Sequence, residues 1–95
     1  MKIKWTAEAE AHLNGIYRYI AQDSPLYANR TLDRLTRRAD HLIDYPRIGR
    51  IVPKYDDPAL RELIVGSYRL VYRVTPDDIE ILAVFHGAQL LPDSL

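Results

Sequence analysis

The stretch that decides the fold reads RELIVGSYRLVYRV, residues 61–74, and a further apolar run follows from Ile79 to Gly87. Gly66-Ser67 is a two-residue loop of the kind that closes a tight β-hairpin. Thr75-Pro76-Asp77-Asp78 is a four-residue turn with proline at its second position, where the fixed φ of proline is already suitable. Three β-rich runs joined by two short turns predict a three-stranded antiparallel meander.

The residues before this stretch predict one strand and two helices. Lys2-Ile3-Lys4-Trp5 alternates polar and apolar side chains, as a short strand does. Thr6 is a suitable N-cap for a helix from Ala7 to Gln22, in which apolar residues recur at helical spacing. Ser24-Pro25 marks a second helix start, and the apolar spacing predicts a helix of about 20 residues before Pro46. We therefore expect an antiparallel helical hairpin.

Alternation along the later strands predicts how the sheet is covered. We expect Tyr68, Leu70, Tyr72 and Val74 to face the helices, which leaves Arg69, Val71 and Arg73 on the other face. The last strand is apolar on both sides, as central strands are, so the N-terminal strand is its natural neighbour. The expected architecture is α+β, with the helical hairpin on one face of a four-stranded, mostly antiparallel sheet.

The second face of this sheet has two interpretations. Val71, Leu82 and Val84 are expected there, rimmed by Arg69, Arg73 and Glu80. An exposed apolar surface of this kind is typical of a binding site. The alternative is that the tail from Leu90 to Leu95, or the proline-rich loop at 46–59, folds back over it.

Composition excludes several classes of protein. The 95 residues have the length of one domain, 1–95, with 13 basic and 13 acidic side chains and no cysteine. Zero net charge means that any binding of a polyanion must come from local clustering, and the lack of cysteine excludes disulfides and thiol chemistry. No apolar run suggests a membrane helix or a secretory signal, so a cytoplasmic protein without membrane association is expected.

The second predicted helix carries a basic ridge. Arg30, Arg34, Arg37 and His41 share one side of it, with Arg38 at the margin. Such a ridge could bind phosphates or an acidic partner. The neighbouring Asp33, Asp40 and Asp44 favour the simpler interpretation, a solvated helix face.

Catalytic and metal-binding patterns are sparse. His12, His41 and His86 show no ligand spacing, so neither a metal nor another cofactor is expected. Ser67 and His86 lack the context of a nucleophile elbow. The remaining candidates are Arg61, Arg69, Arg73 and His86, which could stabilise a phosphate during metal-free ribonuclease chemistry. Alternatively, these arginines pair with Glu62 or Glu80 across strands.

Several separated motifs resemble the RelE/ParE superfamily of toxins. The order is a strand, a helical hairpin, the loop from Pro46 to Pro53, the hairpin at residues 61–74 and the last strand ending in His86-Gly87-Ala88. The resemblance implies a toxin of a type II toxin–antitoxin system. It also implies a small cognate antitoxin, ParD-like or another DNA-binding type, that wraps the toxin in a hetero-oligomer.

The two branches of this superfamily imply different activities. In the RelE-like branch, which cleaves messenger RNA in the ribosome, the strand arginine matches Arg69. Its later arginine and its tyrosine fall at about Gln89 and near Leu95 here, and its lysine-rich strand is represented by Arg61 and Glu62. Loss of proton-transfer and charge-neutralising groups slows such chemistry by orders of magnitude.

The ParE-like branch is similar in its His-Gly-Ala-Gln and terminal Leu-Pro-x-x-Leu elements, and implies a non-enzymatic inhibitor of DNA gyrase. The alternatives are a ribosome-dependent endoribonuclease and a degenerate, harmless toxin that still binds its antitoxin. For the target, the candidate contacts are Arg47, Arg50 and Lys54 of the loop and the sheet arginines Arg69 and Arg73. For the antitoxin we expect a groove along both helices or the free edge of the strand Arg61–Val65, with contacts from Leu13, Ile16, Tyr17, Ile20, Leu32, Leu35, Leu63 and Val65.

Overall fold

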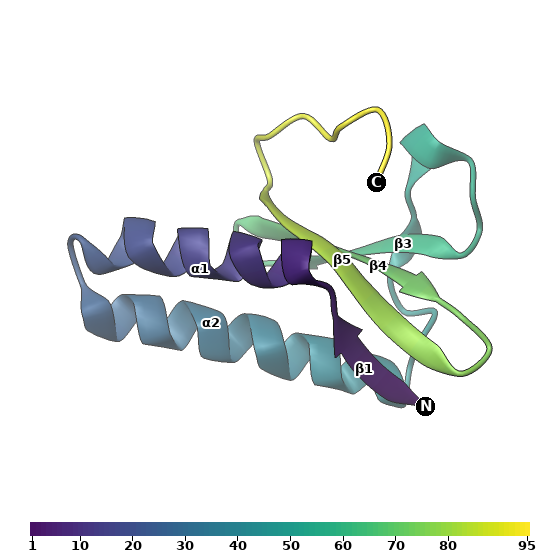
Figure 1. Cartoon of the computed structure of the whole chain (residues 1–95), viewed down its shortest axis with the longest axis horizontal. Coiled ribbons are helices and arrows are strands. Elements are labelled where there is room, and N and C mark those ends of the chain that lie inside the picture. Colours follow the sequence, from purple (N-terminus) through teal and green to yellow (C-terminus); the bar gives the residue numbers. More distant parts are fainter.

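Two helices lie side by side on one face of a twisted sheet in the computed structural model, which describes residues 1–95 (Figure 1). The helices are α1 (Ala7–Ala21) and α2 (Pro25–Asp40), with 3-10 turns at His41–Ile43 and Pro53–Tyr55. The strands are β1 (Lys2–Trp5), β2 (Arg50–Ile51), β3 (Leu60–Val65), β4 (Tyr68–Val74) and β5 (Asp78–His86). Neither helix is long and apolar enough to cross a bilayer.

The strand order is β1-β5-β4-β3-β2, and the predicted α+β class is confirmed. β1 pairs parallel with β5, as expected of an N-terminal strand with no other partner, and all other pairs are antiparallel. The sheet has five strands rather than the four predicted. The additional strand is β2, in which Arg50 pairs with Glu62 and Ile51 with Arg61. The strand predicted at Arg61–Val65 is therefore a free edge only at Leu63–Val65.

Both helices begin where their capping residues predict. The Thr6 hydroxyl accepts a hydrogen bond from the Ala9 N–H at 3.1 Å, and the Ser24 hydroxyl accepts one from the Tyr27 N–H at 3.1 Å. These contacts satisfy N–H groups that the first turn leaves free. The α-helical part of the second helix is shorter than predicted, because the chain tightens after Asp40 into a 3-10 turn that places Leu42 in the core.

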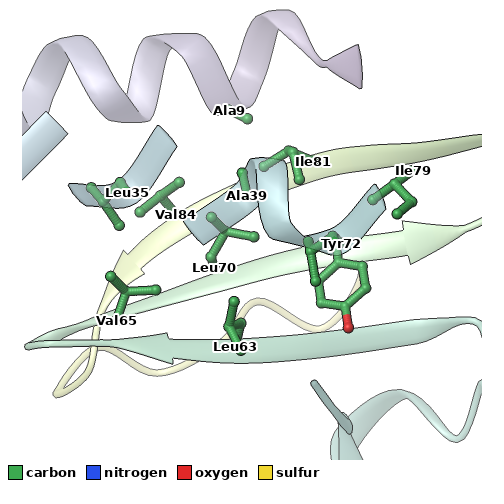
Figure 2. Packing of buried hydrophobic residues seen from close by; sticks show 11 residues of the cluster. Ala9, Leu35, Ala39, Leu63, Val65, Leu70, Tyr72, Ile79, Ile81 and Val84 are labelled. Carbon is green, nitrogen blue, oxygen red and sulfur yellow. The ribbon is translucent and has the colours of Figure 1, made fainter. Parts of the chain in front are cut away.

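The main core lies between the helices and the sheet. Figure 2 shows Leu35 and Ala39 of α2 together with Leu70 of β4 and Val84 of β5. The margin of the cluster is formed by Ile3, Trp5, Leu13, Ile16, Tyr68 and Val74. On β4, Leu70 and Tyr72 lie in the cluster and Tyr68 and Val74 at its margin, so the predicted helix-facing side of this strand is confirmed. The buried members are Ala9, Leu35, Ala39, Leu42, Leu63, Val65, Leu70, Tyr72, Ile79, Ile81 and Val84.

A β-bulge in β5 corrects the predicted faces of that strand. Tyr72 pairs with Ile81, but Val71 pairs with Ala83, so Leu82 is an extra residue without a partner on β4. The alternation inverts beyond this point. Val84 faces the helices, and Ala83 joins Val71 and Val52 on the second face.

The second face carries no helix, and two segments cover its centre. Tyr55 of the loop and Leu91 of the tail pack with Phe85 against the small cluster of Val52, Val71 and Ala83. Figure 1 shows the tail curving toward that loop, on the side of the sheet away from the helices. Of the two interpretations of this face, the structure therefore adopts the folded-back loop and tail over its centre.

A buried tyrosine anchors the segment between α2 and β2. The Tyr72 hydroxyl donates to the Pro46 carbonyl at 2.9 Å and accepts from the Gly49 N–H at 2.9 Å. Burial raises the pKa of Tyr72, against the smaller opposing effects of the Gly49 N–H and Arg61. The Tyr72 hydroxyl thus attaches the loop to the sheet, in addition to the two residue pairs of the short strand β2.

Candidate functional site

A buried carboxylate organises the second face of the sheet. Glu62 of β3 is 1% exposed, although it is a charged residue. Arg50 donates from Nε and Nη2 to Oε1 of Glu62 at 2.7 Å and 2.6 Å, and Arg69 Nη1 lies 3.6 Å from Oε2. A buried charge is tolerated when it is paired in this way. Arg50 and Arg69 therefore hold the Glu62 carboxylate from two sides.

The same face holds the C-terminal tail through side chains that contact its backbone. Arg69 Nη2 donates to the Gln89 carbonyl at 2.7 Å. Lys54 Nζ donates to the Leu91 carbonyl at 2.6 Å, and the Tyr55 hydroxyl donates to the Pro92 carbonyl at 2.6 Å. Lys54 and Arg69 are thus engaged within the chain.

Arg73 also has a carboxylate partner. Its Nη1 lies 3.1 Å from Oδ2 of Asp57, while Oδ1 of Asp57 accepts the Ala59 N–H at 2.9 Å. The pKa of Asp57 is lowered chiefly by the Ala59 N–H; desolvation opposes this, and the hydrogen bond and charge of Arg73 add to the lowering. The ionised carboxylate of Asp57 is therefore the form that the fold favours.

We expect the variant Asp57→Asn to lose less stability in acid than the parent chain. Because the folded-state pKa of Asp57 lies below its ordinary value of 3.8, its contribution is fully present above that value and is lost as the pH falls through the lower folded value. Urea unfolding midpoints at neutral pH and at about pH 3 measure the effect. An equal loss in both proteins would contradict the role given to Asp57.

The structure does not bring the four candidate ribonuclease residues together. Arg61 pairs with Tyr72 across strands, so it lies on the helix-facing side, whereas Arg69 and Arg73 lie on the second face. The Arg61 guanidinium donates to the Gly49 and Arg47 carbonyls at 2.9 Å and 3.3 Å. It supports the loop rather than joining the other two arginines.

His86 also lies on the helix-facing side. It pairs with Tyr68 across strands, and the two rings meet edge to face with centroids 5.6 Å apart. Its Nδ1 accepts the Ala88 N–H at 3.2 Å. The four candidates are thus divided between the two faces, with Arg61 and His86 on the helix-facing side and Arg69 and Arg73 on the second face. Arg69 and Arg73 are each paired with a carboxylate.

The residues expected to contact the target differ in whether their side chains already have partners within the chain. The partners described above engage Arg50, Lys54, Arg69 and Arg73. Arg47 is exposed and no carboxylate pairs with it. It lies in a segment whose large hydrophobic side chains are also exposed: Tyr45 at 65%, Ile48 at 59% and Ile51 at 43%.

The residues expected to contact an antitoxin are divided between core and surface. Leu35, Leu63 and Val65 are buried in the main core, so their side chains are already in contact with the protein itself. Leu13 and Ile16 pack at its margin. Tyr17, Ile20 and Leu32 are half-buried. The apolar stripes of the helices are thus largely used by the sheet.

Two features of the site are missing from the sequence-based prediction. The first is the burial of Glu62, since only its pairing with an arginine was among the predicted alternatives. Its signal is a single acidic residue among the apolar residues of β3. The second is a groove of about 540 Å³ between α1 and the end of β5. Sequence signals for this groove are weak, because the bulge in β5 and the tail both shape it. The groove is lined by residues that include His12, Ile16, Tyr19, Phe85, His86 and Gln89.

Known proteins are similar to this chain in both sequence and fold. Residues 3–91 match the family described as the ParE toxin of type II toxin–antitoxin system, parDE. Toxin RelE2 of Caulobacter vibrioides is 39% identical over 90 residues, which cover 94% of this chain and 98% of that protein.

Among solved structures, the chromosomal ParDE toxin–antitoxin system from P. aeruginosa aligns with a TM-score of 0.75 and 26% identity, covering 90% of this chain and 95% of that one. The toxin–antitoxin complex RelBE2 from Mycobacterium tuberculosis has the same fold, with a TM-score of 0.64 and 22% identity over 90% of this chain and 95% of that one. Since the family match spans nearly the whole chain, the chain belongs to the ParE toxin family of type II toxin–antitoxin systems.

Proposed function

We propose that this toxin inhibits DNA gyrase by protein contact in the cytoplasm, without cleaving RNA, and that a ParD-like antitoxin neutralises it. The observation that carries this proposal is the separation of the four candidate ribonuclease residues. Arg61 and His86 lie on the face opposite Arg69 and Arg73.

The charge distribution supports the same proposal. Transition-state stabilisation in phosphoryl transfer uses cationic groups aimed at the developing charge. Here the two arginines that share a face are directed at Glu62 and Asp57, with Arg69 also bound to the tail. This arrangement is suited to holding loop and tail on the sheet.

The target-contact surface that we propose is the segment 45–51. It presents Arg47 beside Tyr45, Ile48 and Ile51, which are exposed at 65%, 59% and 43%. Arginine and aromatic side chains such as tyrosine are enriched at energetically important positions of protein interfaces. Tyr72 and Arg61 fix the backbone of this segment, so little order has to be gained on binding.

For the antitoxin we propose a position along the helices and the free edge of β3. Leu13 and Ile16 remain partly accessible at the margin of the core, and Ile16 lines the 540 Å³ groove. A partner helix or strand that fills such a groove would bury this apolar surface.

A gyrase supercoiling assay with purified toxin and relaxed plasmid tests the proposal. We expect inhibition by the parent chain, and at least about tenfold weaker inhibition by the double variant Arg47→Glu/Ile48→Asp. Arg18→Glu is the matched control, because Arg18 is an exposed arginine on α1 that lines none of these surfaces. Undiminished supercoiling at a large excess of folded parent chain would refute gyrase as the target.

A further inference from the structure

The outer edge of β3 is unpaired beyond β2. Leu60 directs its carbonyl outward, where the Val52 N–H donates to it at 3.2 Å, and Glu62 faces Arg50 of β2. Backbone groups alternate along a strand, so Ile64 also directs its N–H and C=O to this edge. No strand pairs with Ile64 there, and its side chain is 54% exposed.

Cationic side chains of α2 line the groove beside this edge. A hollow of about 170 Å³ is bounded by Arg30 and Arg34 on one side and by Val65 and Gly66 on the other. A second hollow of about 280 Å³ lies between Arg38 and Leu63. Both hollows therefore join α2 to the unpaired part of β3.

These arginines have no anionic partner within the chain. Arg37, on the same helix, forms a salt bridge with Asp33 at 3.1 Å. Arg30, Arg34 and Arg38 take part in none of the salt bridges of the structure. Of the three aspartates that favoured a solvated ridge, only Asp33 forms a salt bridge, and its partner is Arg37.

Arg34 is positioned over the β3–β4 turn. A methyl group at Gly66, which has a φ of +59°, would lie 2.9 Å from Arg34 Nη1. The guanidinium therefore stands against the turn, at the end of the unpaired edge.

The spacing of the arginines suits an extended chain. Arg34 and Arg38 are one helical step of four residues apart, about 6 Å along the axis. Side chains on one face of a strand recur every ~6.6 Å. A strand added beside Ile64 would place successive side chains of its helix-facing side close to Arg34 and Arg38.

We propose that this groove binds an extended segment of the antitoxin in which acidic and apolar residues alternate. The inference rests on the proposed antitoxin partner and specifies its chemistry. The acidic side chains face Arg34 and Arg38, the apolar ones lie beside Ile64, and the backbone pairs with the N–H and C=O of Ile64.

An NMR titration of the ¹⁵N-labelled toxin tests this assignment with synthetic probes. One probe is a peptide of about eight residues, a typical strand length, that alternates Glu and Val; the other has Gln in place of Glu. We expect the acidic peptide to shift the amide signals of Ile64 and Gly66 and to bind about tenfold more tightly than the Gln peptide.

Two variants of the toxin provide the controls. The double variant Arg34→Gln/Arg38→Gln should lose the preference for the acidic peptide, while the rest of its amide spectrum matches that of the folded parent chain. The variant Arg37→Gln should keep the preference. Equal binding of both peptides, no shift at Ile64 with millimolar peptide, or stronger binding of an oligothymidine to the same arginines would overturn the proposal. The titration involves neither gyrase nor cell growth. A negative titration would therefore leave gyrase as the proposed target, and a negative gyrase assay would leave the peptide-binding groove.

Discussion

Replacing Arg69 by methionine is expected to lower the free energy of unfolding by about 3 kcal/mol, because a buried carboxylate then loses one of its two cationic partners. Glu62 is 1% exposed, and Arg50, its other partner, has a side chain that is 65% exposed. Arg69 also holds the Gln89 carbonyl at 2.7 Å, so the tail loses an attachment at the same time. Urea unfolding followed by circular dichroism gives the difference.

A compensating variant tests whether the buried ion pair is the cause of this loss. Glu62→Leu/Arg69→Met removes the buried charge together with its partner, so most of the lost stability should return. Arg18→Met, at an exposed position on α1, should change stability by less than about 0.5 kcal/mol. If the double variant is as unstable as Arg69→Met alone, the ion pair is not the cause.

The variant Gly49→Ala is expected to cost about 3 kcal/mol, through overpacking and loss of the hydrogen bonds around Tyr72. A methyl group there would lie 2.6 Å from the backbone oxygen of Glu62 and 2.6 Å from the Tyr72 hydroxyl. The backbone of β3 cannot move without disturbing the sheet, so the loop must shift. Thermal and urea unfolding measure the loss.

Gly15→Ala is the matched control for this substitution. A methyl group at Gly15 meets nothing within 4 Å, and the residue lies inside α1. Alanine has the better helix propensity, so this variant should gain up to about 1 kcal/mol. Similar losses of stability in Gly49→Ala and Gly15→Ala would show that the close contacts at Gly49 are not the cause of the effect.

Local signals explain which parts of the fold could be predicted. Thr6 and Ser24-Pro25 fix helix starts through hydrogen bonds to the next turn. Gly66-Ser67 fixes the β3–β4 hairpin, since Gly66 has a φ of +59°. These features depend on residues close in sequence, so the sequence alone identifies them.

The position of Arg61 was predictable from the hairpin, but the prediction that it joins Arg69 and Arg73 is wrong. A two-residue turn pairs Val65 with Tyr68, and counting outward pairs Arg61 with Tyr72. Arg61 must then share the face of Tyr72, opposite Arg69. The register of the hairpin, applied consistently along both strands, is therefore sufficient to separate the arginines.

Other features depend on distant parts of the chain. The bulge at Leu82 sends His86 to the face of Tyr68, and no residue near Leu82 signals it. β2 has only two residues, and it forms because Tyr72 and Arg61 hold the loop beside β3. The burial of the antitoxin candidates Leu63 and Val65 has the same kind of cause, because both side chains pack in the main core with residues of α2.

The central claim, that this toxin acts by docking and not by bond cleavage, is tested most directly by two assays run on the same preparations. The parent chain and Arg73→Gln are each added to gyrase with relaxed plasmid and to translating ribosomes with a defined message. Arg73 is chosen because its ion pair with Asp57 is partly solvent-exposed, at 36% and 38%, so its loss should affect stability little. The account predicts that the parent chain blocks supercoiling and leaves the message intact. Cuts at translated codons that disappear with Arg73→Gln, together with unimpaired supercoiling, would contradict it.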